Sequence, residues 1–363
     1  MGFRFFATVA AVVVAVLAVA AACRPSERRN ALDDSAQSGR PGAGEKPESA
    51  ESSAPSLPVA TPKGSAGWTL VSTVRSGLQH PESVRYDSTL DVYFISNING
   101  DAGTADGNGF ISRVKPDGAM DSLHFIAGGR NGVTLNSPLG LAILGDTLWV
   151  ADINTLRAFD KHTGAHLADA ELASMGAKFL NDVCIGHDGA VYVTDMGLER
   201  DSAGQLTHTG TDHIFRVAGL RGVGQGWNAR DVARGAALEG PNGITWNRLR
   251  GHYVVVPFLG SKIFSWMPGE DPRVIATGPG AFDGVEVLRD GRVLVTSWTD
   301  SSLMELRGDS LRTVITELPQ PADIGLDTRR RQVAIPLSGN NEVVIFTIPE
   351  ITAGRKVPSK VMR

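Results

Sequence analysis

Oxygen-bearing side chains recur in short motifs that each precede a run of strand-forming residues by about ten positions. Glu82, Asn181, Asn242 and Asp283 occupy the second position of four such motifs. Carboxylate and amide oxygens are hard ligands, which suit Ca²⁺, Mg²⁺ or Mn²⁺ better than a metal that prefers thiolates. The four residues therefore indicate a site for one divalent cation, provided that the fold brings them together. The alternative is that each residue caps a turn or contacts water.

These motifs belong to a unit that recurs six times after Trp68. In each unit a four-residue motif, here called the anchor, is followed by two runs of alternating or fully apolar strand formers. Units that recur about every 40 to 60 residues are typical of a β-propeller, whose blades protect each other's edges. The six anchors are Pro81-Glu82-Ser83-Val84, Pro138-Leu139-Gly140-Leu141, Leu180-Asn181-Asp182-Val183, Pro241-Asn242-Gly243-Ile244, Phe282-Asp283-Gly284-Val285 and Pro321-Ala322-Asp323-Ile324.

We therefore predict an all-β fold, a six-bladed β-propeller of four-stranded blades over residues 67–350. Residues 68–74 precede the first anchor and are expected to form the outer strand of the last blade, which closes the ring. If each anchor begins an innermost strand, all six anchors lie at one end of the central channel. The long insertions at residues 98–110 and 197–212 belong to that end and are expected to wall the channel mouth. Carboxylates that converge there repel one another unless a cation or donors compensate.

The first 22 residues have the pattern of an export signal. Residues 5–22 form an apolar run that ends in Ala20-Ala21-Ala22-Cys23, small residues directly before a cysteine. This resembles a bacterial lipobox, so residues 1–22 are predicted to be a lipoprotein-type signal peptide and Cys23 the lipidated residue. The alternatives are an uncleaved anchor and ordinary cleavage after an Ala-x-Ala sequence. All three place the rest of the chain in the cell envelope, periplasmic or extracytoplasmic, with membrane contact only through the N-terminal lipid or anchor.

Composition argues against several other classes of protein. The 363 residues include 35 Lys and Arg against 39 Asp and Glu, so binding to nucleic acid is not expected. The two cysteines, Cys23 and Cys184, cannot build a disulfide framework or a cysteine zinc site. Residues 23–66 are rich in Pro, Gly and Ser and are predicted to be a disordered linker, and residues 351–363 to be a basic tail.

The anchors resemble those of the six-bladed propeller family that includes senescence marker protein (regucalcin), gluconolactonase and luciferin-regenerating enzyme. The resemblance covers roughly Trp68 to Pro349 and implies that Glu82, Asn242 and Asp283 bind one divalent cation, with Ca²⁺ favoured over Mg²⁺, Mn²⁺ or Zn²⁺. The matching motifs, in the family's order, are Pro81-Glu82-Ser83, Asn181-Asp182, Pro241-Asn242-Gly243 and Phe282-Asp283-Gly284.

The same resemblance implies hydrolysis of a lactone or an ester with the metal at the propeller axis. Asp283 is then a catalytic base as well as a metal ligand, and Asn181 contacts the attacking water or a substrate oxygen. Asp182, beside Asn181, and Trp298, near the end of a second strand, are expected to contact a small-molecule substrate.

Two features depart from the family's lactonases. An Arg usually stands two residues before the Asn-Asp pair and binds the sugar acid, whereas this chain has Phe179, which favours a less polar ligand. Blade two, with Pro138-Leu139-Gly140-Leu141, resembles an NHL repeat, which propellers often use to bind partners. The alternative function is therefore a non-enzymatic propeller that binds a ligand or a protein at the cell envelope. A deep funnel that ends at the oxygen ligands favours chemistry, and a plugged channel with an apolar rim favours binding.

Overall fold

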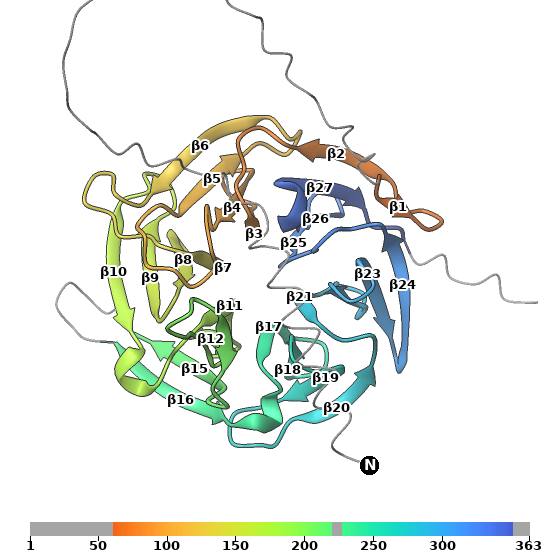
Figure 1. The fold of residues 1–363 in the computed structure, drawn as a ribbon. Helices are drawn as coiled ribbons and strands as arrows, with labels where there is room; N and C mark the ends of the chain where they lie inside the picture. The colour runs from red at the N-terminus through yellow and green to blue at the C-terminus, as the bar shows by residue number, and fades with distance from the viewer. Residues whose placement is uncertain (1–60, 220–226, 351–363) are drawn as a thin grey trace, which may run out of the picture.

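Six antiparallel sheets surround a central channel in the computed structural model, which describes residues 61–219 and 227–350 (Figure 1). In five blades four strands follow one another in chain order from the channel outward, and the sixth takes its outer strand from the start of the domain. The architecture is the six-bladed β-propeller that the repeats predict. The predicted signal peptide, Cys23 and the basic tail lie outside the described residues.

The innermost strand of blades one to five begins at its anchor, and that of blade six directly follows its anchor. Figure 1 shows these strands closest to the channel, where the innermost strands of blades one to five contact one another in turn and that of blade six contacts that of blade one. They are β3 (Pro81–Asp87), β7 (Pro138–Leu144), β11 (Leu180–Ile185), β17 (Pro241–Asn247), β21 (Phe282–Val287) and β25 (Gly325–Asp327).

The remaining strands of each blade follow outward by antiparallel pairing. The second strands are β4 (Val92–Asn97), β8 (Thr147–Asp152), β12 (Val191–Asp195), β18 (His252–Pro257), β22 (Val293–Ser297) and β26 (Gln332–Leu337). The third strands are β5 (Phe110–Val114), β9 (Thr155–Asp160), β15 (His213–Ala218), β19 (Lys262–Trp266), β23 (Ser302–Arg307) and β27 (Glu342–Thr347). The outer strands are β6 (Met120–Ala127), β10 (His166–Glu171), β16 (Asn228–Arg234), β20 (Arg273–Thr277), β24 (Ser310–Thr316) and β2 (Leu70–Val74).

The ring is closed by the first full strand of the domain. Strand β2 pairs antiparallel with β27, with Val74 opposite Val343, and so completes blade six as expected from the sequence. A second closure lies at the axis, where Ser83 of blade one forms a parallel bridge with Asp323 of blade six. The two ends of the domain are therefore held together both at the rim and at the channel.

The ordered domain begins earlier than predicted. Residues 61–66 were expected to belong to the disordered linker, but β1 (Lys63–Gly64) pairs with β24 and gives blade five a fifth strand. The Nζ atom of Lys63 lies 2.5 Å from the Oε1 atom of Glu317. The composition of the linker concealed this pairing, because an open sheet edge offers backbone donors and acceptors to a segment of almost any sequence.

The core lies between neighbouring blades rather than inside any one of them. For example, Val84 and Ile95 of blade one pack in one buried cluster with Ala334 and Val343 of blade six. Each sheet is thus apolar on both faces, because both faces are covered by a neighbouring sheet. Burial of these faces fixes the register of every strand and so the position of every anchor.

Short elements complete the connections. The insertion at residues 197–212 contains a hairpin of β13 (Leu198–Arg200) and β14 (Leu206–His208). Three single-turn helices of the 3₁₀ type are η1 (Ala173–Met175), η2 (Ala236–Leu238) and η3 (Ser338–Asn340). Within residues 61–219 and 227–350, no helix has the length and apolar character to cross a membrane.

Candidate metal centre at one end of the channel

Four unpaired oxygens are buried at the anchor end of the channel. Glu82, Asn181, Asn242 and Asp283 are each less than a tenth exposed, with exposed fractions of 7%, 4%, 2% and 3%. Each has one buried side-chain oxygen without a hydrogen-bond partner among the described residues. These atoms are Glu82 Oε2, Asn181 Oδ1, Asn242 Oδ1 and Asp283 Oδ1. A buried unpaired acceptor costs about 1–3 kcal/mol, so four of them on equivalent strands call for a shared compensating partner.

The electrostatic interactions of Glu82 and Asp283 show that these two side chains and Asn242 lie close together. Burial raises the pKa of Glu82 well above its ordinary value, and the negative charge of Asp283 raises it further. Burial likewise raises the pKa of Asp283, while the side chains of Trp298 and Asn242 lie close enough to oppose that rise. A cation placed between these carboxylates would instead lower the pKa of both Glu82 and Asp283.

The donor set fits a hard divalent cation. It consists of two carboxylates and two amides, all supplying oxygen, as Ca²⁺ and Mg²⁺ prefer. Among the described residues no three His, Cys, Asp or Glu side chains gather in the manner of a metal site, so amide oxygens have to supply part of the coordination. The orphaned oxygen of Asn242 meets that requirement, and the orphaned oxygen of Asn181 is available to water or substrate.

A recurrent β-bulge aims the anchor side chains. In blade one, Pro81 pairs with Asn97 and Val84 with Ile95, so the inner strand has one residue more than its partner between these two pairs. The same shift occurs at the anchors of β7, β11, β17 and β21. A bulge bends its strand and re-aims a side chain, which explains why the second anchor residue recurs as the position of the oxygen donors.

Hydroxyl side chains hold the bulges in blades one, three and five. The Oγ1 atom of Thr194 accepts a hydrogen bond from the backbone N–H of Asp182 at 2.9 Å and donates to the carbonyl of Asn242 at 2.6 Å. Ser96 and Thr296 accept in the same way from the third anchor residue of their own blades. Sequence reasoning missed these residues. Their signal is a Ser or Thr at one recurring position near the end of the otherwise apolar second strands.

Glycines at the third anchor position let neighbouring blades approach. A Cβ atom on Gly243 would lie 2.3 Å from the backbone oxygen of Asp283, and one on Gly284 would lie 2.7 Å from the Cα atom of Asp323. Real Cβ atoms do not come so close to backbone. The Gly of the Pro-Asn-Gly and Asp-Gly motifs is therefore required by packing between inner strands, next to the residues that carry the oxygens.

Asp152, Asp195 and Trp298, at or near the ends of second strands, have two different roles. The carboxylate of Asp195 accepts hydrogen bonds from the backbone N–H groups of Lys178 and Phe179, and Asp152 does the same for the loop before blade two. These two residues cap the loops that lead into the anchors. Trp298 instead lies beside Asp283, and its ring is 5.3 Å from that of Phe258.

An ion cluster closes the channel next to the anchors. Arg85 Nη2 lies 3.1 Å from Asp182 Oδ1 and 3.0 Å from Asp323 Oδ2, and both carboxylates are fully buried. Asp182 also accepts the backbone N–H groups of Val183 and Ile244. The structure therefore assigns Asp182 to the support of the channel, which differs from the predicted contact with substrate.

An apolar cluster covers the oxygen donors on the other side. Phe179 is buried together with Ile98, Leu139, Met196 and Leu198. Met196 is in direct contact with the site, because its sulfur lies 3.0 Å from Asn181 Nδ2.

The two long insertions supply much of this cover. Ile98 and Ala102 come from the insertion of blade one, and Leu198 and Leu206 from that of blade three. Arg200 joins the insertions by donating hydrogen bonds to the carbonyl oxygen of Ala102. The mouth thus combines buried oxygen donors, as chemistry requires, with the apolar rim and plugged channel that favour binding.

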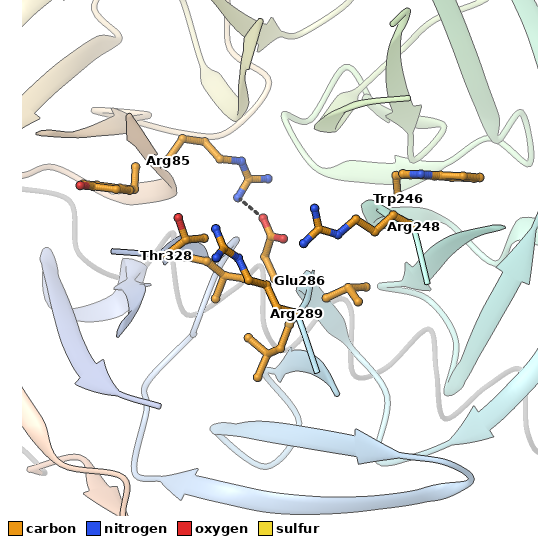
Figure 2. Close-up of a pocket in the computed structure, with 10 residues that line it drawn as sticks. Arg85, Trp246, Arg248, Glu286, Arg289 and Thr328 are labelled. Atoms are coloured by element: carbon orange, nitrogen blue, oxygen red, sulfur yellow. Dashed lines mark ion pairs between the residues drawn. The ribbon is translucent and has the colours of Figure 1, made fainter. Parts of the chain in front are cut away.

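Two open cavities lie at the opposite end of the channel. They have volumes of about 340 and 260 Å³, and both are lined by Arg85 and Glu286, beyond the ion cluster. Neither is lined by any of the four oxygen donors. The larger one is the subject of Figure 2.

Fold and site together define a six-bladed β-propeller with an oxygen-donor set at one end of its axis. No protein-family model matches the chain, and no curated protein matches its sequence. Solved structures do share the fold. A gluconolactonase from Xanthomonas campestris is 16% identical, with a TM-score of 0.55 over 81% of this chain and 99% of that one.

Two further solved structures are lyases. A streptogramin B lyase is 12% identical, with a TM-score of 0.52 over 77% of this chain and 97% of that one. A virginiamycin B lyase from Staphylococcus aureus is 14% identical, with a TM-score of 0.52 over 77% and 99%. The chain thus has the propeller fold of the gluconolactonases expected from its anchors, a fold that also carries lyases.

Proposed function

We propose that this propeller is a divalent-cation-dependent hydrolase of a lactone or an ester with an apolar substituent. The observation that carries the proposal is a set of four buried oxygens that lack hydrogen-bond partners within residues 61–219 and 227–350, from Glu82, Asn181, Asn242 and Asp283. The presence of a gluconolactonase among the structures of the same fold supports the same class of reaction.

Glu82, Asn242 and Asp283 would hold the cation, and the all-oxygen donor set favours Ca²⁺. When bound, such an ion supplies Lewis-acid polarisation of the substrate carbonyl. In our proposal Asp283 takes a proton from the attacking water through whichever carboxylate oxygen is not engaged as a ligand. Asn181 orients the water or the substrate oxygen, since its amide nitrogen donates to the weakly accepting sulfur of Met196.

The apolar cluster beside the oxygen donors favours a substrate with an apolar substituent. Phe179 and Leu139 pack in one cluster with Met196, which contacts Asn181, and none of the three side chains carries a charge. A sugar-acid lactone would lose hydrogen bonds to water there without gaining others, whereas an alkyl or aryl group would not. Trp298, beside Asp283, is the remaining aromatic surface that we propose for substrate contact.

The test combines metal analysis with a substrate panel. Metal content of the purified protein is measured first. Hydrolysis of an alkyl-substituted γ-lactone, an aryl ester and an aldonolactone is then followed before chelation, after chelation, and after addition of Ca²⁺, Mg²⁺, Mn²⁺ or Zn²⁺. We expect turnover of the apolar lactone or ester that disappears on chelation and returns with one cation. Asp283→Ala should abolish it, and Asp117→Ala, an exposed carboxylate in an outer turn, should not.

Activity that survives both chelation and Asp283→Ala would refute the proposal. The second candidate is a binding propeller without turnover, which the apolar rim and the plugged channel favour. It would be supported by a bound cation together with saturable binding of the intact lactone, unchanged after prolonged incubation.

We also propose that the domain is held at the cell envelope by lipid on Cys23, a residue outside the described range. Mass spectrometry of the mature N-terminus tests this. A diacylglyceryl-modified Cys23 is expected, and a mature chain that lacks Cys23, or retains residues 1–22, would overturn it.

A further inference from the structure

The cavity at the end of the channel opposite the oxygen donors has the features of a separate binding site. Its volume of about 340 Å³ is sufficient for a small organic molecule. It is lined by the ends of the innermost strands of blades one, four, five and six and by the turns that follow them in blades four, five and six. The ion cluster around Arg85 separates it from the anchors, so it is no part of the site described above.

Two arginines of this cavity have no polar partner among the residues that the structure describes. Arg248 and Arg289 are exposed, and neither guanidinium forms a hydrogen bond or an ion pair within the described part of the chain. Figure 2 shows both guanidinium groups directed toward Glu286 and Thr328 at the centre of the cavity. Two like charges that converge in this way repel each other, and the carboxyl group beside them, that of Glu286, is shared with Arg85.

Two arginines of the neighbouring turn in blade six are paired, unlike Arg248 and Arg289. Arg330 of blade six lies 2.8 Å from Asp91 and 2.8 Å from Asp327, and Arg329 also approaches Asp91. The guanidinium groups of Arg248 and Arg289 are thus available to a ligand, whereas those of Arg329 and Arg330 are already paired with carboxylates.

The floor of the cavity limits the charge that a ligand can carry. Glu286 lies there, and its Oε1 atom is 3.4 Å from Arg85 Nη1. A second negative charge on the ligand would face this side chain whenever it is ionised, because Arg85 is already shared with Asp182 and Asp323. A monoanion is therefore favoured over a dianion.

The walls are apolar. Val287, Leu288 and Leu326 line the cavity next to the polar groups, as does the aromatic ring system of Trp246. A ligand that fits both surfaces has one anionic group for the arginines and an apolar body for the walls. We propose that this cavity binds an organic monocarboxylate, with the carboxylate on Arg248 and Arg289 and the apolar body against Val287 and Leu326.

Calorimetric titration with hexanoate tests the proposal, with hexanamide as the uncharged match and acetate as the match without an apolar body. We expect hexanoate to bind, acetate to bind at least fivefold more weakly, and hexanamide not to bind at equal concentration. The double variant Arg248→Gln/Arg289→Gln should weaken hexanoate binding at least tenfold. Arg250→Gln, on the same turn as Arg248 but outside the cavity, is the matched control and should not change it.

Carboxylates can also bind a metal at the other end, so each titration is repeated with Asp283→Ala in the presence of a chelator. Hexanoate binding that persists there, and is lost in the double arginine variant, supports the cavity independently of the proposed function. Absence of hexanoate binding to the wild-type chain would overturn the proposal. So would equal loss in Arg250→Gln, or preferential binding of inorganic phosphate.

Discussion

The Nη2 atom of Arg85 lies 3.1 Å from Asp182 Oδ1, which joins the innermost strands of blades one and three across the channel. These residues are 97 positions apart in the chain. Arg85 Nη2 also lies 3.0 Å from Asp323 of blade six. The guanidinium is thus a common centre for three blades, and it carries positive charge into a channel that otherwise holds mainly buried carboxylates.

Removal of this guanidinium is expected to destabilise the domain strongly. Arg85→Met leaves Asp182 and Asp323 buried without their cation, which costs about 3–5 kcal/mol in comparable buried pairs. Denaturant unfolding measures the loss. Arg113→Met is the matched control, because its partner Asp121 and Arg113 itself are partly exposed, and it should cost less than about 1 kcal/mol. Equal effects of the two variants would contradict the central role of Arg85.

Loss of a bulge-holding hydroxyl should weaken both the fold and the site. Thr194→Val leaves the N–H of Asp182 and the carbonyl of Asn242 without their partner, at a cost of about 1–3 kcal/mol. Because Asn242 is a proposed ligand, calcium should also raise the melting temperature less than in the wild type. Thr207→Val, which removes an exposed hydroxyl on β14, should change neither quantity. If calcium raises the melting temperature of Thr194→Val as much as that of the wild type, this hydroxyl does not support the metal site.

The close approach of blades four and five can be tested with one methyl group. In Gly243→Ala the new Cβ would lie 2.3 Å from the backbone oxygen of Asp283, so we expect a loss of about 2 kcal/mol or more. Gly251→Ala has open space around its Cβ but a φ of +70°, and should cost about 1 kcal/mol from backbone strain alone. Thermal unfolding measures both losses. A larger loss in Gly243→Ala would show that close packing between blades requires glycine at this anchor position, and an equal or smaller loss would contradict this.

Glu286 gives a pH dependence with a definite sign. Burial, which outweighs the attraction of Arg85, raises its pKa from 4.5 to about 7. Between these two values the folded protein keeps a proton that the unfolded chain releases, so stability falls as pH rises through this window. Relative to Glu286→Gln, the wild type should lose about 1–3 kcal/mol of unfolding free energy between about pH 4.5 and pH 8.

Chemical denaturation of both proteins at several pH values measures that difference. If the unfolding free energies of the wild type and Glu286→Gln change with pH in parallel, the pKa of Glu286 is not raised in the folded state.

The apolar cover predicts a specificity change that depends on the proposed function. Phe179→Ala should lower kcat/KM for an apolar lactone about tenfold, because a buried aromatic contact contributes about 1–3 kcal/mol. The exposed Leu144→Ala should have no effect. Steady-state kinetics with an aldonolactone in parallel separates loss of apolar contact from general damage. An equal loss for both substrates would point to damage.

Much of the fold could be predicted because its signals are local. Each anchor lies about ten residues before an apolar strand, and six such units allow only a ring in which each sheet is covered by its neighbours. The residues 68–74 were assigned to blade six for the same reason, since a strand before the first anchor has only the open edge of the last blade to join. By contrast, β1 has no apolar pattern, so only the paired structure reveals it.

The sequence by itself determined which residues stand at the second anchor position, and hence that Glu82, Asn242 and Asp283 are candidates for one site. Tertiary structure alone decided what surrounds them: Arg85 between Asp182 and Asp323, the hydroxyl of Thr194 beneath Asn242, and Phe179 under two insertions. The physical reason is that hydrogen bonds and ion pairs between distant residues depend on the closure of the ring, which no local pattern of residues encodes.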